Sequence, residues 1–342
     1  MVVSLRVDRL WVRWKMRKKS LLIIPLSLFV TCIAPGILVS RSGAQGPAVR
    51  ESHVPVGGAN LFVREVGTGP PIIVLHGGPD FDQSYMLPEM DRLADRYHLI
   101  YYDQRGRGKS AKGVKPDEVT LASDISDIEK VRQYFHLDTV TLLGHSWGTV
   151  LALEYALKYP GRVSHLIVMN PGPASREDYV ELRKEWLEKR ADLVTQKKAI
   201  AETQAYKEGD PEAVTAYYRI HFTPAFARKE NYEKLITRMH ADFTKDGVLK
   251  ARAVEDRLMQ ETWAKADFDL LPQLKTLKLP TLVLSGDHEF IPASSAEHIA
   301  NAIPNAHLAT MKDCGHFTYM ECPVPVHSEI DALFAERSHP HQ

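Results

Sequence analysis

The sequence has few cysteines, no excess of charge of either sign and only one long apolar run. Three cysteines among 342 residues are too few for a disulfide-stabilised scaffold, and none has the Cys-x-x-Cys spacing of a zinc site. Basic and acidic residues both number 43, but 45–342 alone holds 35 basic and 42 acidic residues. The acidic segment 45–342 gives no electrostatic basis for binding nucleic acid. Nothing in the sequence calls for a metal or an organic cofactor.

The single long apolar run lies at 21–40, behind a basic stretch and ahead of the small residues Ser42 and Ala44. A basic segment, an apolar segment and small residues in this order are typical of a secretory signal peptide. Twenty apolar residues are also enough for an uncleaved membrane anchor. We therefore interpret 1–44 as a signal peptide or an anchor. Either alternative predicts an exported protein, periplasmic or secreted, whose only membrane contact is this segment.

Short apolar runs alternate with amphipathic stretches through most of the remaining chain. The runs are rich in Val, Ile and Leu and lie at 61–66, 71–77, 98–104, 139–145, 165–170, 281–286 and 306–311. Such runs are typical of buried strands in a parallel sheet, and the stretches between them have apolar residues at helical spacing, for example at 119–136 and 147–159. The pattern predicts an α/β fold with a mostly parallel sheet flanked by helices.

The alternation stops at 172–272, where the sequence is typical of charged amphipathic helices. We interpret this segment as a helical cap inserted between a first part of the core, 45–171, and a second part, 273–342. Because the segment follows one predicted strand and precedes the next, we expect it over the carboxyl edge of the sheet, where open α/β folds bind ligands. A cap of this length predicts a small-molecule or short-peptide substrate.

The strongest local motif is Gly-His-Ser-Trp-Gly at 144–148, directly after a predicted strand and directly before a predicted helix. A G-x-S-x-G sequence in this context predicts a nucleophile elbow that exposes the Ser146 hydroxyl. The tetrahedral intermediate then needs backbone donors aimed at its oxyanion. The N–H of Trp147 is one predicted donor, and the N–H of Gly78, in the glycine-rich turn after the strand at 71–77, is the other.

A serine nucleophile needs a base and a third group that orients the base, in the chain order serine, acid, histidine for this kind of elbow. His316 fits as the base because it follows the last predicted strand and precedes the last predicted helix. The turn after 281–286 offers two acids. We favour Glu289, at the apex of the turn, with Asp287 as the alternative, and we expect the unused carboxylate to cap the turn.

Two cysteines, Cys314 and Cys322, flank the predicted base. In an exported protein they have the opportunity to form a disulfide that pins the His316 loop, and two free thiols are the alternative.

Five motifs together resemble one known superfamily. They are HGGPD at 76–80, DQRGRGKS at 103–110, GHSWGT at 144–149, GDHEFIP at 286–292 and CGHF at 314–317. From about 53 to 337 the chain is similar, motif by motif, to the α/β-hydrolase superfamily, and most similar to its proline iminopeptidase (prolyl aminopeptidase) branch. The resemblance implies the α/β-hydrolase fold with a helical cap, a serine nucleophile at Ser146 and a triad acid at Glu289.

The resemblance also implies a reaction, the removal of an N-terminal proline by Ser146, His316 and Glu289. A carboxylesterase or lactonase of the same fold is the alternative, and a non-catalytic binding protein on this scaffold is a further one. The family usually has glycine at the positions of Asp80 and His145.

In the proline iminopeptidase branch, carboxylates of the cap hold the free amine of the substrate. The cap of this chain is rich in glutamates, including Glu181, Glu185, Glu208 and Glu212, none of which matches a family motif. Amphipathic helices carry glutamate on their solvated face by default, so no single one of them is favoured.

Overall fold

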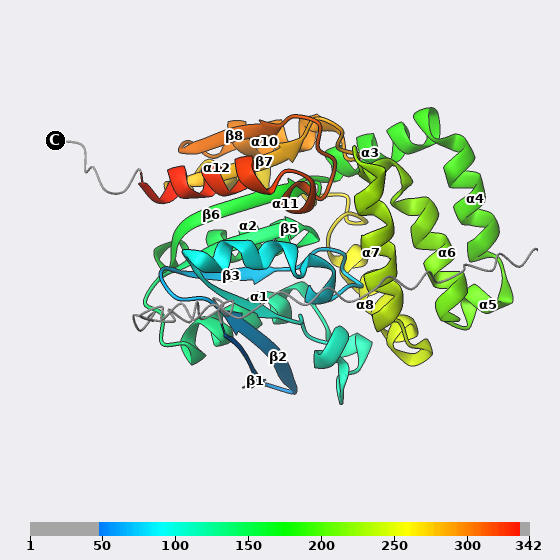
Figure 1. Cartoon of the computed structure of the whole chain (residues 1–342), viewed down its shortest axis with the longest axis horizontal. Helices are drawn as coiled ribbons and strands as arrows, with labels where there is room; N and C mark the ends of the chain where they lie inside the picture. Colours follow the sequence, from blue (N-terminus) through cyan, green and yellow to red (C-terminus); the bar gives the residue numbers. More distant parts are fainter. Residues whose placement is uncertain (1–47, 336–342) are drawn as a thin grey trace, which may run out of the picture. The chain divides into compact units, whose positions relative to one another are not determined.

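A computed structural model describes residues 48–335 of the chain, and these residues belong to one compact unit, 45–342 (Figure 1). The segment interpreted as a signal peptide or anchor, 1–44, lies outside the described residues, so export stays a prediction. Within 48–335, every helix is too short or too polar to cross a bilayer.

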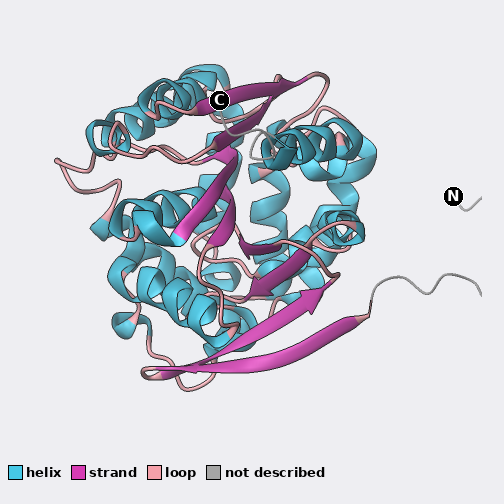
Figure 2. Cartoon of the chain, turned by 90° about the vertical axis from the view of Figure 1, so that its left-hand side faces the viewer, coloured by secondary structure: helices cyan, strands magenta, loops and turns pink. Residues whose placement is uncertain are grey.

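An eight-stranded sheet forms the centre of the described chain (Figure 2). Its strands are β1 (Val49–Val56), β2 (Ala59–Val66), β3 (Pro71–Leu75), β4 (His98–Tyr102), β5 (Val140–Ser146), β6 (Val163–Pro171), β7 (Thr281–Gly286) and β8 (Ala306–Met311). Their order across the sheet is β1-β2-β4-β3-β5-β6-β7-β8. The pairs β1/β2 and β2/β4 are antiparallel, and every pair from β4 to β8 is parallel. The predicted fold class, a mostly parallel sheet, is confirmed.

One strand, β1, has no counterpart among the predicted apolar runs. It lies at the edge of the sheet and pairs only with β2, and its first five residues are exposed or half-buried. An edge strand with one face in water alternates polar and apolar residues, so it lacks the continuous apolar run of a parallel strand.

The longer helices are α1 (Leu121–Tyr134), α2 (Trp147–Lys158), α3 (Arg176–Lys189), α4 (Ala191–Ala201), α6 (Pro211–His221), α7 (Lys229–Asp242), α8 (Lys245–Glu261), α10 (Ala293–Ala302) and α12 (Pro323–Ala335). Three single turns of helix are α5 (Gln204–Lys207), α9 (Leu271–Leu274) and α11 (Thr318–Glu321). Short 3₁₀ segments are η1 (Gln83–Met86), η2 (Glu89–Asp95), η3 (Gly108–Ala111), η4 (Pro116–Glu118), η5 (Pro160–Arg162) and η6 (Thr223–Ala225).

Consecutive residues of the central strands pack into two different apolar cores. In β5, Leu142 belongs to the core that contains residues of α1, α2 and α10, whereas Leu143 belongs to the core that contains residues of η2 and α12. Side chains alternate across a strand, so a strand covered on both faces needs apolar residues at nearly every position. In agreement with this, six of the seven residues of β5 are buried.

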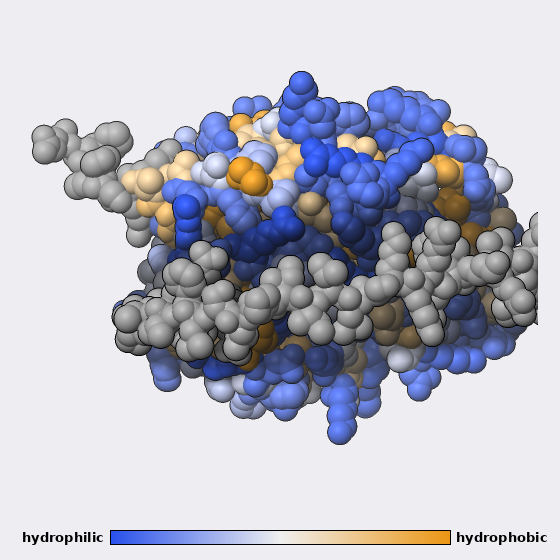
Figure 3. Space-filling model, viewed as in Figure 1, coloured by the Kyte–Doolittle hydropathy of each residue, from blue (hydrophilic) through white to orange (hydrophobic). Residues whose placement is uncertain are grey.

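Helices α3 to α8 fill the chain between β6 and β7 and gather at one end of the sheet (Figure 1). Residues of α3, α4, α6 and α8 line a cavity together with Ser146, the last residue of β5. The segment therefore lies over the carboxyl edge of the sheet, and its division from the core as a separate cap at 172–272 stays a prediction. Hydrophilic side chains cover most of the face seen in Figure 3, with smaller apolar patches between them.

Candidate active site

Ser146 lies at the sharp turn where β5 ends and α2 begins. Its backbone has φ 55° and ψ −119°, a conformation that costs a residue with a side chain about 1–3 kcal/mol. Two residues later, a Cβ on Gly148 would overlap the carbonyl of Leu75, so only glycine lets α2 approach the sheet this closely. The turn leaves Ser146 half-buried against a cavity of about 250 Å³.

His316 lines the same cavity, and its Nδ1 lies 2.8 Å from Oε1 of Glu289. The backbone N–H groups of Phe290 and Ile291 donate to the same oxygen at 2.8 and 3.2 Å, and the Asn170 amide donates to Oε2 at 2.8 Å. Burial by itself raises the pKa of Glu289, but the charge of His316 and these hydrogen bonds outweigh burial and lower it overall. The carboxylate accepts from Nδ1–H of His316, which leaves Nε2 able to accept a proton.

Asp287, the alternative acid, is directed elsewhere. Its Oδ1 accepts from the N–H of Cys314 at 3.2 Å and lies 2.7 Å from Nδ1 of His288. No contact between Asp287 and His316 is present in the described structure. A disulfide joins Cys314 to Cys322, whose Cα atoms are 6.3 Å apart, across the loop that carries His316.

Gly78 and Trp147, the predicted oxyanion donors, line the cavity beside Ser146. Gly78 has φ +56°, and a Cβ at this position would overlap the ring of Phe81. Trp147 is the first residue of α2, so its N–H has no partner within the helix and adds to the positive end of the helix dipole. Backbone donors in this arrangement favour a negatively charged oxygen near Ser146.

His145 connects three loops around the nucleophile, a role that the sequence analysis did not predict. Its Nδ1 lies 2.7 Å from the Tyr85 hydroxyl, and its Nε2 lies 2.9 Å from the carbonyl oxygen of His316. The Tyr85 hydroxyl in turn accepts from the N–H of Gly77 at 2.6 Å. Complete burial lowers the pKa of His145 well below its usual value. A neutral ring that accepts from Tyr85 and donates to the His316 carbonyl satisfies both contacts.

Two carboxylates line the cavity. Asp80 follows the glycine-rich turn and accepts a hydrogen bond from the hydroxyl of Tyr218, and Glu255 comes from α8. Burial raises the pKa of both groups, and the Asp80 charge contributes further to a Glu255 pKa well above its usual value. Glu181, Glu185, Glu208 and Glu212 do not line this cavity.

Two basic residues, Arg183 of α3 and Lys197 of α4, line the same cavity. Lys197 Nζ lies 2.8 Å from Nδ1 of His221, and burial lowers the pKa of Lys197 to about 8. The rest of the wall is mainly aromatic: Tyr179, Trp186, Tyr206, Tyr217, Tyr218, Phe222, Trp263, Phe290 and Phe317. The cavity therefore suits a small substrate with a ring or an apolar chain and at least one charged group.

The fold and this arrangement define the class of protein: the chain belongs to the alpha/beta hydrolase fold family, whose model matches residues 70–323. It is 26% identical over 271 residues to the AB hydrolase superfamily protein YclE of Bacillus subtilis, which covers 78% of this chain and 92% of that protein. It is 25% identical over 293 residues to the proline iminopeptidase of Saccharolobus solfataricus. This match covers 80% of this chain and 88% of that protein.

Among solved structures, a proline iminopeptidase from Mycobacterium smegmatis matches with a TM-score of 0.62 at 22% identity, covering 84% of this chain and 98% of that one. This match confirms the fold, and the family model and the sequence relatives confirm the resemblance to the α/β-hydrolase superfamily and its proline iminopeptidase branch.

Proposed function

We propose that this α/β-hydrolase is a serine hydrolase that uses Ser146, His316 and Glu289 as a catalytic triad. Ser146 Oγ attacks the substrate carbonyl while His316 Nε2 takes the hydroxyl proton, and the N–H groups of Gly78 and Trp147 stabilise the oxyanion. His316 then gives the proton to the leaving group, and water releases the acyl group by the same steps. The contact between His316 and Glu289 at 2.8 Å supports this assignment.

For the substrate we propose a peptide with an N-terminal proline, which makes the protein a prolyl aminopeptidase. The observation that carries this proposal is the pair Asp80 and Glu255 in the Ser146 cavity. An N-terminal proline presents a secondary ammonium with two N–H donors, and two carboxylates match its charge and its donors. Buried carboxyl groups with raised pKa values lose their proton most readily when a cation replaces it.

A carboxylesterase or lactonase is the second candidate, favoured by Arg183 and Lys197. These cations balance the acid pair, and the aromatic wall fits an acyl chain or a lactone ring as well as it fits proline.

The deciding experiment is a paired assay of the full chain on prolyl-4-nitroanilide and on 4-nitrophenyl butyrate, with Ser146→Ala as the control. Cleavage of the prolyl amide that disappears in the control supports the aminopeptidase. Cleavage of the ester alone overturns the aminopeptidase and favours the second candidate. If neither substrate is cleaved and a serine-reactive phosphonate does not react with the protein, a non-catalytic binding protein is favoured.

We also propose export, on the basis of the basic and apolar pattern in 1–44. Sequencing the N-terminus of the mature protein tests this proposal. A chain that begins after Ala44 supports a cleaved signal peptide, and a chain that begins upstream supports an anchor.

A further inference from the structure

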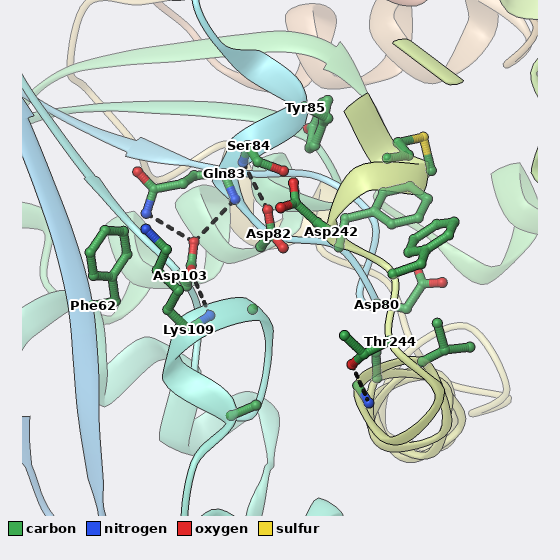
Figure 4. A pocket seen from close by; sticks show the side chains of 18 of the residues that line it. Phe62, Asp80, Asp82, Gln83, Ser84, Tyr85, Asp103, Lys109, Asp242 and Thr244 are labelled. Carbon is green, nitrogen blue, oxygen red and sulfur yellow. Dashed lines mark hydrogen bonds between the residues drawn. The ribbon is translucent and has the colours of Figure 1, made fainter. Parts of the chain in front are cut away.

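A second cavity of about 410 Å³ lies beside the Ser146 cavity (Figure 4). Residues of β2, η1 and η3 line one side of it, and residues of α6, α7 and α8 line the other. The two cavities share a wall made of Asp80, Phe81, Tyr85 and Tyr218. None of Ser146, Glu289 and His316 lines the second cavity, so its chemistry is separate from the triad.

Besides Asp80, which also lines the Ser146 cavity, three carboxylates of the second cavity have no salt-bridge partner among residues 48–335. They are Asp82, Asp103 and Asp242, and Figure 4 shows the carboxylates of Asp82 and Asp242 turned toward each other. The charge of Asp242 acts on Asp82 across this gap, and that of Asp82 acts on Asp103. Burial, together with the charge of Asp82, raises the pKa of Asp103 to about 7.

Two of the three basic residues on this wall are paired with carboxylates. Arg64 donates to both carboxylate oxygens of Asp91, at 2.8 and 2.6 Å. Lys109 lies 3.9 Å from a carboxylate oxygen of Glu51 and 4.0 Å from the centre of the Phe62 ring. Arg252 donates to the carbonyl of Tyr206 at 2.9 Å and stacks on its ring, but no carboxylate pairs with it, and its Nη2 has no hydrogen-bond partner in the described structure. The lining nevertheless holds five acidic residues and only three basic ones, so an excess of acidic groups is left for a ligand to balance.

Two further features of the wall favour a cation. Asp242 is the last residue of α7, where the exposed carbonyl groups form the negative end of the helix dipole and a carboxylate is unfavourable. Gln83, only 4% exposed, donates its amide N–H to Asp103 at 2.9 Å and leaves its Oε1 buried without a partner in the described structure. A buried acceptor without a donor is costly, so this side of the cavity also favours a donor group.

The apolar part of the wall indicates what kind of cation fits. It consists of Phe62, Phe81, Leu87, Val214, Met239, Phe243 and Val248. A metal ion needs three or more ligand atoms close together, and the group of described residues with that spacing is Asp287, His288 and Asp313, on the surface elsewhere. A cavity that combines carboxylates with aromatic side chains suits a larger ligand, because aromatic faces attract organic cations and bury their apolar parts.

We propose that the second cavity is a binding site for an organic cation with an apolar body, such as an arylalkylammonium. The ammonium group lies between Asp82 and Asp242, and the apolar body packs against Phe81 and Phe243. Because Phe81 also packs on Gly78, a ligand here contacts the wall that holds a proposed oxyanion donor. The site is thus placed to influence the Ser146 cavity without entering it.

The test is isothermal titration calorimetry of the full chain with 2-phenylethylammonium and with the neutral 2-phenylethanol. We expect saturable binding of the ammonium and at least tenfold weaker binding of the alcohol. Asp242→Asn removes one charge from an exposed helix end, and we expect it to raise the Kd of the ammonium about tenfold, equivalent to about 1.4 kcal/mol. Asp82→Asn, whose side-chain oxygen can still accept from the Ser84 N–H, is the second variant and is expected to act in the same direction.

The experiment measures binding rather than turnover, so its result does not depend on the proposed function. Two matched variants serve as controls. Asp138→Asn removes an exposed carboxylate outside both cavities, and Glu255→Gln removes one from the Ser146 cavity. Both are expected to bind the ammonium as the parent chain does. Equal binding of alcohol and ammonium overturns the proposal, and so does normal binding by both cavity variants. A loss confined to Glu255→Gln, or saturable Ca²⁺ binding in place of the ammonium, overturns it as well.

Discussion

The two sides of the Ser146 cavity are built in different ways. On the sheet side, Ser146 is the last residue of β5, and Glu289 and His316 lie on the loops that follow β7 and β8. Hydrogen bonds hold these segments to one another. On the helical side, Glu255 and Lys197 come from separate helices, and stacked rings join α3 to α6 and to Trp263 just after α8. Under the proposed function, the sheet edge supplies the chemistry, whereas the helices, together with Asp80 on the turn after β3, select the substrate.

Replacing the nucleophile gives the largest expected effect and acts on the sheet side alone. Ser146→Ala should lower kcat roughly 10⁵-fold, because the members of a triad act as a unit. The loss should be equal for the prolyl amide and the ester if one site cleaves both. Ser328→Ala, an exposed serine on α12, is the matched control and should leave kcat unchanged. A variant that keeps full activity on either substrate would place that reaction elsewhere.

Substitutions of the two acids after β7 should have clearly different effects on kcat. Glu289→Gln should lower kcat roughly 10³- to 10⁴-fold, because an amide cannot hold the His316 tautomer or stabilise its positive charge as a carboxylate does. Asp287→Asn keeps an oxygen for the Cys314 N–H and should change kcat less than threefold. Steady-state kinetics on one substrate decides between them, and the reverse order of effects would make Asp287 the acid.

The same contrast explains how much of the site the sequence predicts. Ser146, Glu289 and His316 are recognisable because each follows an apolar run, and the end of a strand fixes where a side chain lies.

Glu255 is one glutamate among many on amphipathic helices, and whether it faces water or the cavity depends on how α8 packs. The hydrogen bonds of His145 to Tyr85 and to the His316 loop join residues 60 and 171 positions apart, so no local pattern reveals them. Asp80 is adjacent to a motif, but only Tyr218 and the cavity show what it contacts.

A change on the helical side should separate the two substrates. Glu255→Gln should raise KM for prolyl-4-nitroanilide about 30-fold, since a charged hydrogen bond contributes about 2 kcal/mol. The KM for the neutral ester should stay within twofold of the parent value, because that substrate has no ammonium group. Glu212→Gln, an exposed glutamate of α6, is the matched control. Equal losses on both substrates would mean that Glu255 supports the site rather than recognises the amine.

The pH dependence gives an independent test of the acid pair, which joins Glu255 of α8 to Asp80 on the turn after β3. Burial raises the pKa of Glu255 and Asp80, so these groups gain protons at a higher pH than an exposed carboxyl does. Only the ionised pair attracts an ammonium group, so kcat/KM for the prolyl amide should fall as pH decreases through these raised pKa values, by up to about tenfold per pH unit for each carboxyl group that gains a proton. This additional fall should be absent from the ester profile. Superimposable profiles for the two substrates would contradict the role of the acid pair.

The smallest expected effect concerns the connection between the turns on the sheet side. Tyr85→Phe removes the hydroxyl that accepts from Gly77 and contacts His145, while the ring keeps its packing. Losing about 1 kcal/mol of positioning should lower kcat about fivefold with KM unchanged, and equally for the amide and the ester. Tyr134→Phe, an exposed tyrosine of α1, should change neither. If Tyr85→Phe instead changes KM for one substrate only, the wall shared by the two cavities takes part in substrate recognition. The division between a sheet side for chemistry and a helical side for selectivity then fails at this residue.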